Sequence, residues 1–415
     1  MMNFPLRKLF YSALFCASFS ACVDNSRSPQ QQQNSSAEDF DFLGMMANYA
    51  DNIIVPNYQA LSSSAEKLSA EDGVLATYCA AIDDSVTEVS EEVADAWLEL
   101  QAAIQRSEMH ILGPVSENSG GLLNRINSYN GSELSLCGID QAVVLASQAS
   151  DFDITLRTNN QRGVTALEYL LFDNSLTHHC PSQIPETADW NQRSAEERRQ
   201  LRCNYAQIVS ADIGNSAAEL LQAWAIDGEN YRLDFINPNN VEDNLSALSD
   251  ALFYLDVDVK DRKLGIPTGI NNEGCSAIAC ADAVESPFAE ASLRHIRHNL
   301  ESFAEMLTGG EGLGFDDIIR FAGVDELNSR MLTAVDDAIV AIDNMEVSLK
   351  QQADAIVTSE DEAACANALA NPGSPSEQAA CRLFGLIRRL TDDLKVDFVA
   401  AVNVDLPERG QADND

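Results

Sequence analysis

Apolar residues that recur at intervals of three and four positions constrain the fold of this chain most strongly. The clearest sets are Val89, Val93, Trp97, Leu100 and Ile104, and Leu293, Ile296, Leu300, Phe303 and Leu307. This spacing places apolar side chains on one face of an α-helix, and no comparable run alternates with the two-residue period of a β-strand. We therefore predict an all-α fold in which amphipathic helices pack as antiparallel bundles.

The segment from Asp227 to Asp243, "DGENYRLDFINPNNVED", separates two helical halves. It is rich in Asn and Asp and contains one Pro, which is typical of a loop. We predict a first helical bundle over 38–230 and a second over 244–405, related as a tandem pair. The cleft between two such bundles is a common place for a ligand site.

The first 22 residues have the pattern of an export signal, because Arg7 and Lys8 precede an apolar stretch and small residues precede Cys22. The apolar stretch is shorter than the roughly 20 residues that cross a bilayer. Its ending, "FSAC", resembles a bacterial lipobox, in which the cysteine is acylated. We predict a lipoprotein signal peptide over 1–21, a lipid anchor at Cys22 and a flexible polar tether over 22–37; plain secretion is the alternative.

The localisation that follows from this pattern is the cell envelope. No aspartate follows the anchor cysteine, and Val23 stands there instead, which resembles outer-membrane sorting in Gram-negative bacteria. We therefore expect a protein anchored to the outer membrane and facing the periplasm. The net charge of −39 repels nucleic acid and anionic lipid headgroups, so we expect no nucleic-acid partner and membrane contact only through the lipid anchor.

The chain contains ten cysteines, and eight remain once Cys16 of the signal and Cys22 of the anchor are set aside. An even number in an exported chain indicates disulfide-closed loops, although spacing alone does not fix the connectivity. Proximity in the sequence favours the pairs Cys79–Cys137, Cys180–Cys203, Cys275–Cys280 and Cys365–Cys381. No C-x-x-C pair occurs, which argues against a zinc site.

Four separated stretches resemble, in their order and spacing, the motifs of the imelysin-like family. They are "HILGP" from His110, "RGVTALEYLLF" from Arg162, "VESPFAEASLRHIRHNLESF" from Val284 and "GEGLGFDDII" from Gly310. This family includes imelysin peptidases and iron-regulated lipoproteins of bacterial envelopes. The resemblance covers nearly the whole chain after the signal, and it implies a ligand site and a role in iron or metal uptake.

The second stretch resembles the family's G-x-H-x-x-E helix but departs from it at one position. This chain has Gly163, Thr165 and Glu168, so threonine replaces the histidine. Imidazole is a good ligand for iron or zinc, whereas a neutral hydroxyl is a poor one. The substitution argues against metallopeptidase activity and leaves Glu168 as the metal ligand to test, with iron or another divalent metal as the candidate cofactor.

Glu168 lies in an otherwise apolar run, so it needs either a ligand or a protein partner. The resemblance favours a ligand site in the cleft, and the alternative is that Glu168 pairs with Arg162 or with an arginine of the second half. Glu285 is either a second carboxylate facing this site or a charge at a helix N-terminus. The residues that we expect to line the ligand site are Glu168, Thr165, Arg162, Glu285, Ser286 and His110.

Two further histidines, His295 and His298, flank apolar positions of a predicted helix. Because Arg294 and Arg297 lie beside them and nearby cations oppose metal binding, we interpret both as surface residues. His110 is equally compatible with the C-terminus of a helix, where its charge would be favourable.

The function that we expect is that of an envelope lipoprotein that binds a metal ion or a small ligand for iron or metal uptake. Its partner would be an envelope iron-transport component. Two alternatives stay open: a metallopeptidase, and a protein-binding module without catalytic activity. The sequence has no G-x-S-x-G, Walker-type phosphate loop or H-E-x-x-H motif.

Overall fold

The computed structural model describes residues 40–83, 85–129, 131, 133–271, 275–407 and 411. The predicted signal peptide 1–21, the anchor Cys22 and the tether 22–37 therefore lie outside the described residues. Phe40–Asp415 forms one compact unit. The structure is all-α, as predicted, and contains no β-strand within the described part of the chain.

Turns and loops of different lengths join the helices along the chain. In the first half they are α1 (Phe42–Asn48), α2 (Val55–Ser69), α3 (Val74–Ala80), α4 (Glu91–Ser107), α5 (Glu117–Ile126), α6 (Leu136–Gln148), α7 (Gly163–Phe172) and α8 (Ala195–Trp224). In the second half they are α9 (Arg232–Phe235), α10 (Val241–Leu252), α11 (Ile266–Thr268), α12 (Ser292–Thr308), α13 (Phe315–Phe321), α14 (Asp325–Asp343), α15 (Leu349–Asp354), α16 (Ser359–Ala370), α17 (Ala379–Asp393) and α18 (Val399–Val402).

The fold also contains helical segments that are wider than an α-helix, the π-helices, and turns that are tighter, the 3-10 helices. The π-helical segments are η1 (Tyr49–Ile54), η6 (Leu255–Gly265) and η8 (Leu394–Phe398). The 3-10 turns are η2 (Gly113–Val115), η3 (Ile154–Leu156), η4 (Asn159–Gln161), η5 (Trp190–Gln192) and η7 (Ala281–Ala283). Since π-helical backbone is uncommon and is often found at functional sites, the long segment η6 is of interest for the site described below.

Local sequence explains where the long helices begin. The Ser90 hydroxyl accepts a hydrogen bond from the Val93 backbone N–H at the start of α4, where two glutamates occupy the first turn. The Ser194 hydroxyl accepts one from the Glu197 N–H at the start of α8, at 3.0 Å. These caps satisfy backbone donors that have no partner inside the helix, and acidic residues near the helix N-terminus complement its dipole.

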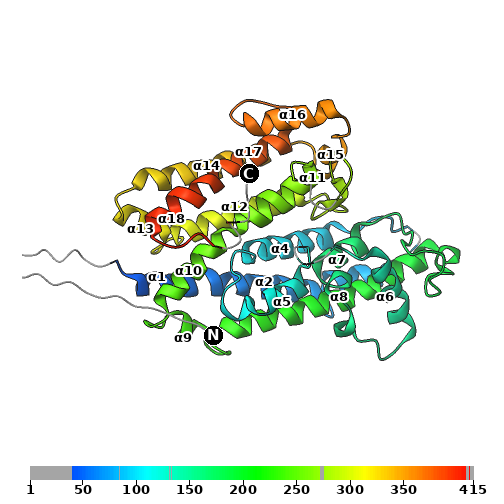
Figure 1. Cartoon of the computed structure of the whole chain (residues 1–415). Helices are drawn as coiled ribbons and strands as arrows, with labels where there is room; N and C mark the ends of the chain where they lie inside the picture. The colour runs from blue at the N-terminus through cyan, green and yellow to red at the C-terminus, as the bar shows by residue number, and fades with distance from the viewer. Residues whose placement is uncertain are drawn as a thin grey trace, which may run out of the picture. The chain divides into compact units, whose positions relative to one another are not determined.

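The helices pack in two groups that share one hydrophobic core. In the first group, α2 contacts α4 and α8, and α7 contacts α8; in the second, α14 and η6 contact α17. Helix α12 contacts both α4 and α14, so it joins the groups. Figure 1 shows α2, α4, α7 and α8 lying together, with α12, α14 and α17 beside them. The exact domain limits, 38–230 and 244–405, stay a prediction.

Four disulfides close loops of the fold, and two of them match the predicted pairs, Cys275–Cys280 and Cys365–Cys381. The other two predicted pairs are wrong, because the structure joins Cys79 to Cys203 and Cys137 to Cys180. The physical reason is that α3 packs against α8, which brings Cys79 to within a Cα–Cα distance of 5.6 Å of Cys203 despite their separation of 124 residues. Proximity along the sequence therefore misled the prediction.

The helices of the described part of the chain were also compared with the length and hydrophobicity that a membrane span requires. None of these helices is both long and apolar enough to cross a bilayer.

Candidate ligand site

Helix α7 carries Glu168 and is buried on nearly every side. Every residue from Gly163 to Leu171 is buried, which accounts for the apolar run around the carboxylate. The backbone of Gly163 has φ +78°, and a Cβ atom there would lie 2.7 Å from the carbonyl oxygen of Ile126. Only glycine adopts this conformation without strain and permits so close an approach, so Gly163 sets the start of α7 against the end of α5.

The Glu168 carboxyl group reaches from the first half of the chain to the loop before α12. Its Oε1 accepts hydrogen bonds from the Ser286 hydroxyl at 2.8 Å, from the Phe288 N–H at 2.9 Å and from the Ala289 N–H at 2.8 Å. All three bonds go to one oxygen, and Oε2 has no hydrogen-bond partner among the described residues. The alternative interpretation, in which Glu168 pairs with Arg162 or an arginine of the second half, is therefore wrong.

Burial governs the protonation of Glu168. The residue is 1% exposed, and the loss of solvation raises the pKa of its carboxyl group to about 7, against the opposing effect of the Ala289, Ser286 and Phe288 hydrogen bonds. Since all of these donors are neutral dipoles, they lower the cost of the charge without removing it. Near neutral pH the group is therefore able both to donate and to accept a hydrogen bond at Oε2.

A pocket of about 900 Å³ opens beside this carboxyl group. Glu168, Thr165 and Glu285 line it, together with Pro287 and Phe288 of the loop that holds Glu168. Its other walls bring apolar and charged side chains together, and they include Leu134, Leu136, Ile266, Val284, His179, Arg262 and Lys350. A volume of this size is typical of small-molecule sites, which combine apolar walls with a few directed polar groups.

The residues around Glu168 do not fit a bare metal ion. The Thr165 hydroxyl lies 3.3 Å from the Ser128 hydroxyl and supplies no charge, and Oε1 of Glu168 is already taken by three donors. Within the described residues, no group of three or more His, Cys, Asp or Glu side chains has the arrangement to hold a metal. The threonine thus removes the ligand that the family's motif would provide.

Glu285 stands at the junction between the pocket and a buried ionic network. Its Oε2 lies 3.0 Å from the Lys263 Nζ, and its Oε1 accepts hydrogen bonds from the Gln105 and Asn127 side-chain amides, each at 2.9 Å. Burial opposes its ionisation, but the Lys263 charge prevails and holds the pKa of Glu285 well below its ordinary value. Glu285 is therefore a charged partner of Lys263 and is not the helix N-terminal charge of the alternative interpretation.

Lys263 is the centre of this network. Its Nζ donates to Glu108 Oε2 at 2.6 Å and to Asn299 Oδ1 at 3.0 Å, and its side chain is 1% exposed. Burial raises the pKa of Glu108. Burial lowers the pKa of Lys263, but the charges of Glu108 and Glu285 raise it by more, so the net change is an increase. The Asn127 amide donates to both carboxylates, since it also lies 2.9 Å from Glu108 Oε1. One lysine thus holds two acids, one at the C-terminal end of α4 and one in the loop before α12.

Two of the predicted site residues lie elsewhere. Arg162 pairs with Asp212 of α8 through two hydrogen bonds, one of 2.6 Å from Nε, and both side chains are buried. His110 is buried as well, and its Nε2 lies 2.8 Å from the Asn57 amide, where burial lowers the pKa of the ring to about 4. Arg162 therefore anchors the start of α7, and neither residue is among those that line the pocket.

The prediction that His295 is a surface residue is also wrong. The residue is 1% exposed, with Nδ1 at 3.2 Å from Glu285 Oε2, because α12 packs against α4 through a polar face that lies beside its apolar seam. Polar residues at helical spacing mark that face and give the signal that sequence reasoning missed. On α12 they are Ser292, His295, Asn299 and Ser302, and on α4 they are Gln101, Gln105 and Glu108, which caps the helix; all are buried.

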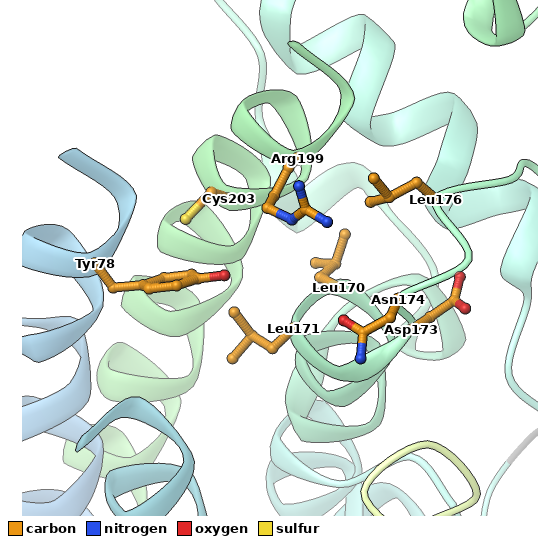
Figure 2. A pocket seen from close by; sticks show the side chains of 8 residues that line it. All are labelled: Tyr78, Leu170, Leu171, Asp173, Asn174, Leu176, Arg199 and Cys203. Carbon is orange, nitrogen blue, oxygen red and sulfur yellow. The ribbon is translucent and has the colours of Figure 1, made fainter. Parts of the chain in front are cut away.

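A second, much smaller pocket lies at the other end of α7. Figure 2 shows Leu170 and Leu171 of α7 facing Arg199 and Cys203 of α8, with Tyr78 of α3 beside them. Its volume of about 10 Å³ is room for a single water molecule at most. It is therefore a packing defect next to the Cys79–Cys203 disulfide and not a ligand site.

Comparison with solved structures identifies the fold. The crystal structure of an imelysin-like protein from Psychrobacter arcticum 273-4 is similar with a TM-score of 0.61 and 14% identity, over 88% of this chain and 96% of that one. That of a protein from Parabacteroides distasonis ATCC 8503, named as an iron-regulated protein A precursor, is similar with a TM-score of 0.58 and 15% identity, over 87% and 97%.

Sequence comparison identifies the family. No curated protein matches the chain. Residues 54–375, which include α7, Glu285 and α12, match the peptidase family described as Imelysin. Because this match spans most of the chain and the fold agrees with it, the protein belongs to the imelysin family.

Proposed function

We propose that this protein is a binding protein of the cell envelope that holds a small ligand against Glu168 for iron or metal uptake. The observation that carries the proposal is a buried carboxyl group whose Oε1 is fixed by three donors while the residue lines a pocket of about 900 Å³. The link to iron rests on the family and on the name of one structurally similar protein.

The chemistry of the pocket favours a ligand with an organic body. Glu168 and Thr165 offer directed polar groups, whereas Leu134, Leu136 and Phe288 offer apolar surface. A metal that enters such a pocket brings most of its ligands with it, because the protein supplies too few. We therefore propose a metal complex of an organic chelator as the ligand, with Glu168 and Thr165 bonded to the chelator.

The envelope location and the partner follow from the same proposal. Acylation at Cys22 anchors the protein to the outer membrane facing the periplasm, and an envelope iron-transport component receives the ligand. Membrane fractionation of the full chain and of Cys22→Ser tests the anchor, since the variant should move from the membrane fraction to the soluble fraction. An unchanged distribution contradicts it.

Titration calorimetry of the full chain tests the ligand proposal. The probes are ferric citrate, ferrous ion and zinc ion, each added to the wild type, to Glu168→Gln and to Glu219→Gln, a control at an exposed carboxylate of an ion pair with Arg125. Ferric citrate should bind the wild type and the control at one defined site in addition to any site that iron-free citrate occupies, and Glu168→Gln should weaken this binding at least tenfold.

The remaining outcomes of the same titrations separate the alternatives. Tight one-site binding of bare zinc that is lost in Glu168→Gln contradicts the chelate proposal and restores a metal site. Weak, multiple and salt-sensitive binding of all three probes reports only the acidic surface, and it overturns the proposal of a defined site.

A further inference from the structure

A third pocket, of about 530 Å³, lies between α4, α12 and the C-terminal end of α14. From α4 it is lined by Leu98, Glu99, Gln101 and Ala102, and from α14 and its end by Ile342, Asp343 and Met345. Helix α12 contributes Leu293, Arg294, His295, Arg297 and His298. It shares none of its lining residues with the Glu168 pocket.

The first two turns of α12 carry an unusual concentration of basic side chains. Arg294, His295, Arg297 and His298 follow one another there, and the first turn contains no acidic residue. Cations are unfavourable at a helix N-terminus, where the dipole is positive. They are more unexpected still in a chain whose net charge is −39. This arrangement therefore requires compensation by negative charge from outside the helix terminus.

The protein's own carboxylates compensate only part of this charge. Glu301 is shared by Arg106, Arg297 and His298, and hydrogen bonding from His298 lowers its pKa to about 2. Asp343 pairs with Arg297, at 3.1 Å.

Two lining residues remain to be placed. The carboxylate of Glu99 belongs to an ion pair with Lys67 of α2. Arg294 is exposed and has no ion-pair partner among the described residues, so a cation remains available at the pocket.

The second observation is the buried imidazole of His295. Its Nδ1 lies 3.2 Å from Glu285 Oε2, and neither ring nitrogen has a hydrogen-bond partner among the described residues. A buried polar atom without a partner is costly. Because His295 lines the pocket that contains Arg294, a ligand bound there would supply the missing partner.

We propose that this pocket binds a small oxyanion, a carboxylate or a phosphate, between Arg294 and His295. The guanidinium of Arg294 pairs with the anion from the solvent side. His295 takes up a second proton when the anion binds and donates to it from the buried side through Nε2–H. Arg297 adds positive potential, while Gln101 of α4 closes the opposite wall. The site is separate from the Glu168 pocket, so an organic anion and the ligand of that pocket can bind together.

Titration calorimetry of the full chain with inorganic phosphate and with citrate tests this site. At least one of the two anions should bind with a stoichiometry of one per chain. Arg294→Gln and His295→Gln should each weaken this binding at least tenfold, and Glu168→Gln should leave it unchanged. Selective binding of phosphate or of citrate identifies the source of the anion, and thermal unfolding confirms that each variant is folded.

The matched control is Arg389→Gln, which removes the charge of another exposed arginine that has no ion-pair partner among the described residues, on α17. It should leave anion binding unchanged. Absence of saturable binding of both anions to the wild type overturns the proposal, and so does an equal loss in Arg389→Gln and Arg294→Gln. If His295→Gln fails to fold, the contrast between Arg294→Gln and Arg389→Gln still decides.

Discussion

Glu168 and Glu285 lie on the same pocket wall, 1% and 3% exposed, yet their carboxyl groups behave in opposite ways. Burial raises the pKa of Glu168 to about 7. Glu285 is equally desolvated, but the Lys263 charge holds its pKa well below the ordinary value. The difference lies in the partners, because Glu168 meets only neutral donors and Glu285 meets a full positive charge.

This contrast separates a group that is available to a ligand from a group that holds the fold. The charge of Glu285 is committed to Lys263, and through Lys263 to Glu108 of the first half. Glu168 is held in place by dipoles and stays near its titration point at neutral pH. A ligand that offers either a donor or an acceptor is therefore able to bond it. The predictions below test this contrast.

The largest effect is expected from Lys263→Met, which leaves Glu108 and Glu285 buried without their cation. Breaking a buried pair by removing one partner costs about 3–5 kcal/mol. Urea unfolding at pH 7 should therefore show a loss of this size in the free energy of unfolding. The control Lys67→Met removes an exposed pair with Glu99 and should change it by less than about 1 kcal/mol. An equal loss in both variants contradicts a central role for Lys263.

The next effect is a pH dependence of stability that belongs to Glu168. Its pKa rises from an ordinary value of 4.5 to about 7 in the folded state, so the folded protein holds this proton more tightly than the unfolded chain does. The contribution is therefore complete below pH 4.5 and is lost as the pH rises to 7. The shift corresponds to about 3 kcal/mol.

Comparison of the wild type with Glu168→Gln isolates the contribution of Glu168 to the pH dependence of stability, because the amide does not titrate. The difference in unfolding free energy between the two proteins should change by that amount between the two pH values. The unfolding free energy of both proteins is measured in urea at each pH. The contributions of the other titrating groups then cancel in the difference between the two proteins. A difference that is independent of pH would show that the carboxyl has the same pKa in the folded and unfolded states.

A smaller effect is expected from Ser286→Ala, which removes one of the three donors to Glu168. The lost bond of 2.8 Å should lower the free energy of unfolding at pH 7 by about 1–2 kcal/mol. The pH dependence due to Glu168 should become steeper, since the ionised form loses more than the neutral form. The control Thr333→Ala removes an exposed hydroxyl on α14 and should have an effect within about 0.5 kcal/mol.

The smallest effect is expected from Thr165→Val, which replaces a hydroxyl by a methyl group of similar shape. It removes the partner of the buried Ser128 hydroxyl and should cost about 1 kcal/mol. Because Thr165 makes no hydrogen bond with Glu168, the pH dependence should stay that of the wild type. A changed pH dependence would place Thr165 in the electrostatics of Glu168.

The helices and the key residues of the site were predictable from sequence because both leave local signals. Threefold and fourfold spacing of apolar residues predicted the helices, and a carboxylate inside an apolar run drew attention to Glu168. The motif around Glu285 and Ser286 placed them beside it. In each case the signal lies within a few neighbouring residues: either a charged residue inside an apolar run or a short motif.

The ionic network was not predictable in the same way, because its members come from five separate segments. Lys263 lies in a charged stretch of η6 that has the composition of a solvated surface, and only tertiary packing buries it. Arg162 was predicted to line the site, but it pairs with Asp212 of α8, which lies 50 residues away in the sequence. Spacing carries no information about such pairs, whereas the buried polar faces of α4 and α12 would have indicated that the two helices meet.

The Cys79–Cys203 disulfide has a consequence for the order in which disulfides form during synthesis of the chain. A chain made from its N-terminus presents Cys79 and Cys137 to each other before Cys180 or Cys203 exists. The pairing that sequence proximity suggested is thus the first one open to the nascent protein. Reaching the native bonds then requires thiol–disulfide exchange after α8 is complete. Folding of this protein under oxidising conditions should therefore be accelerated by a disulfide isomerase.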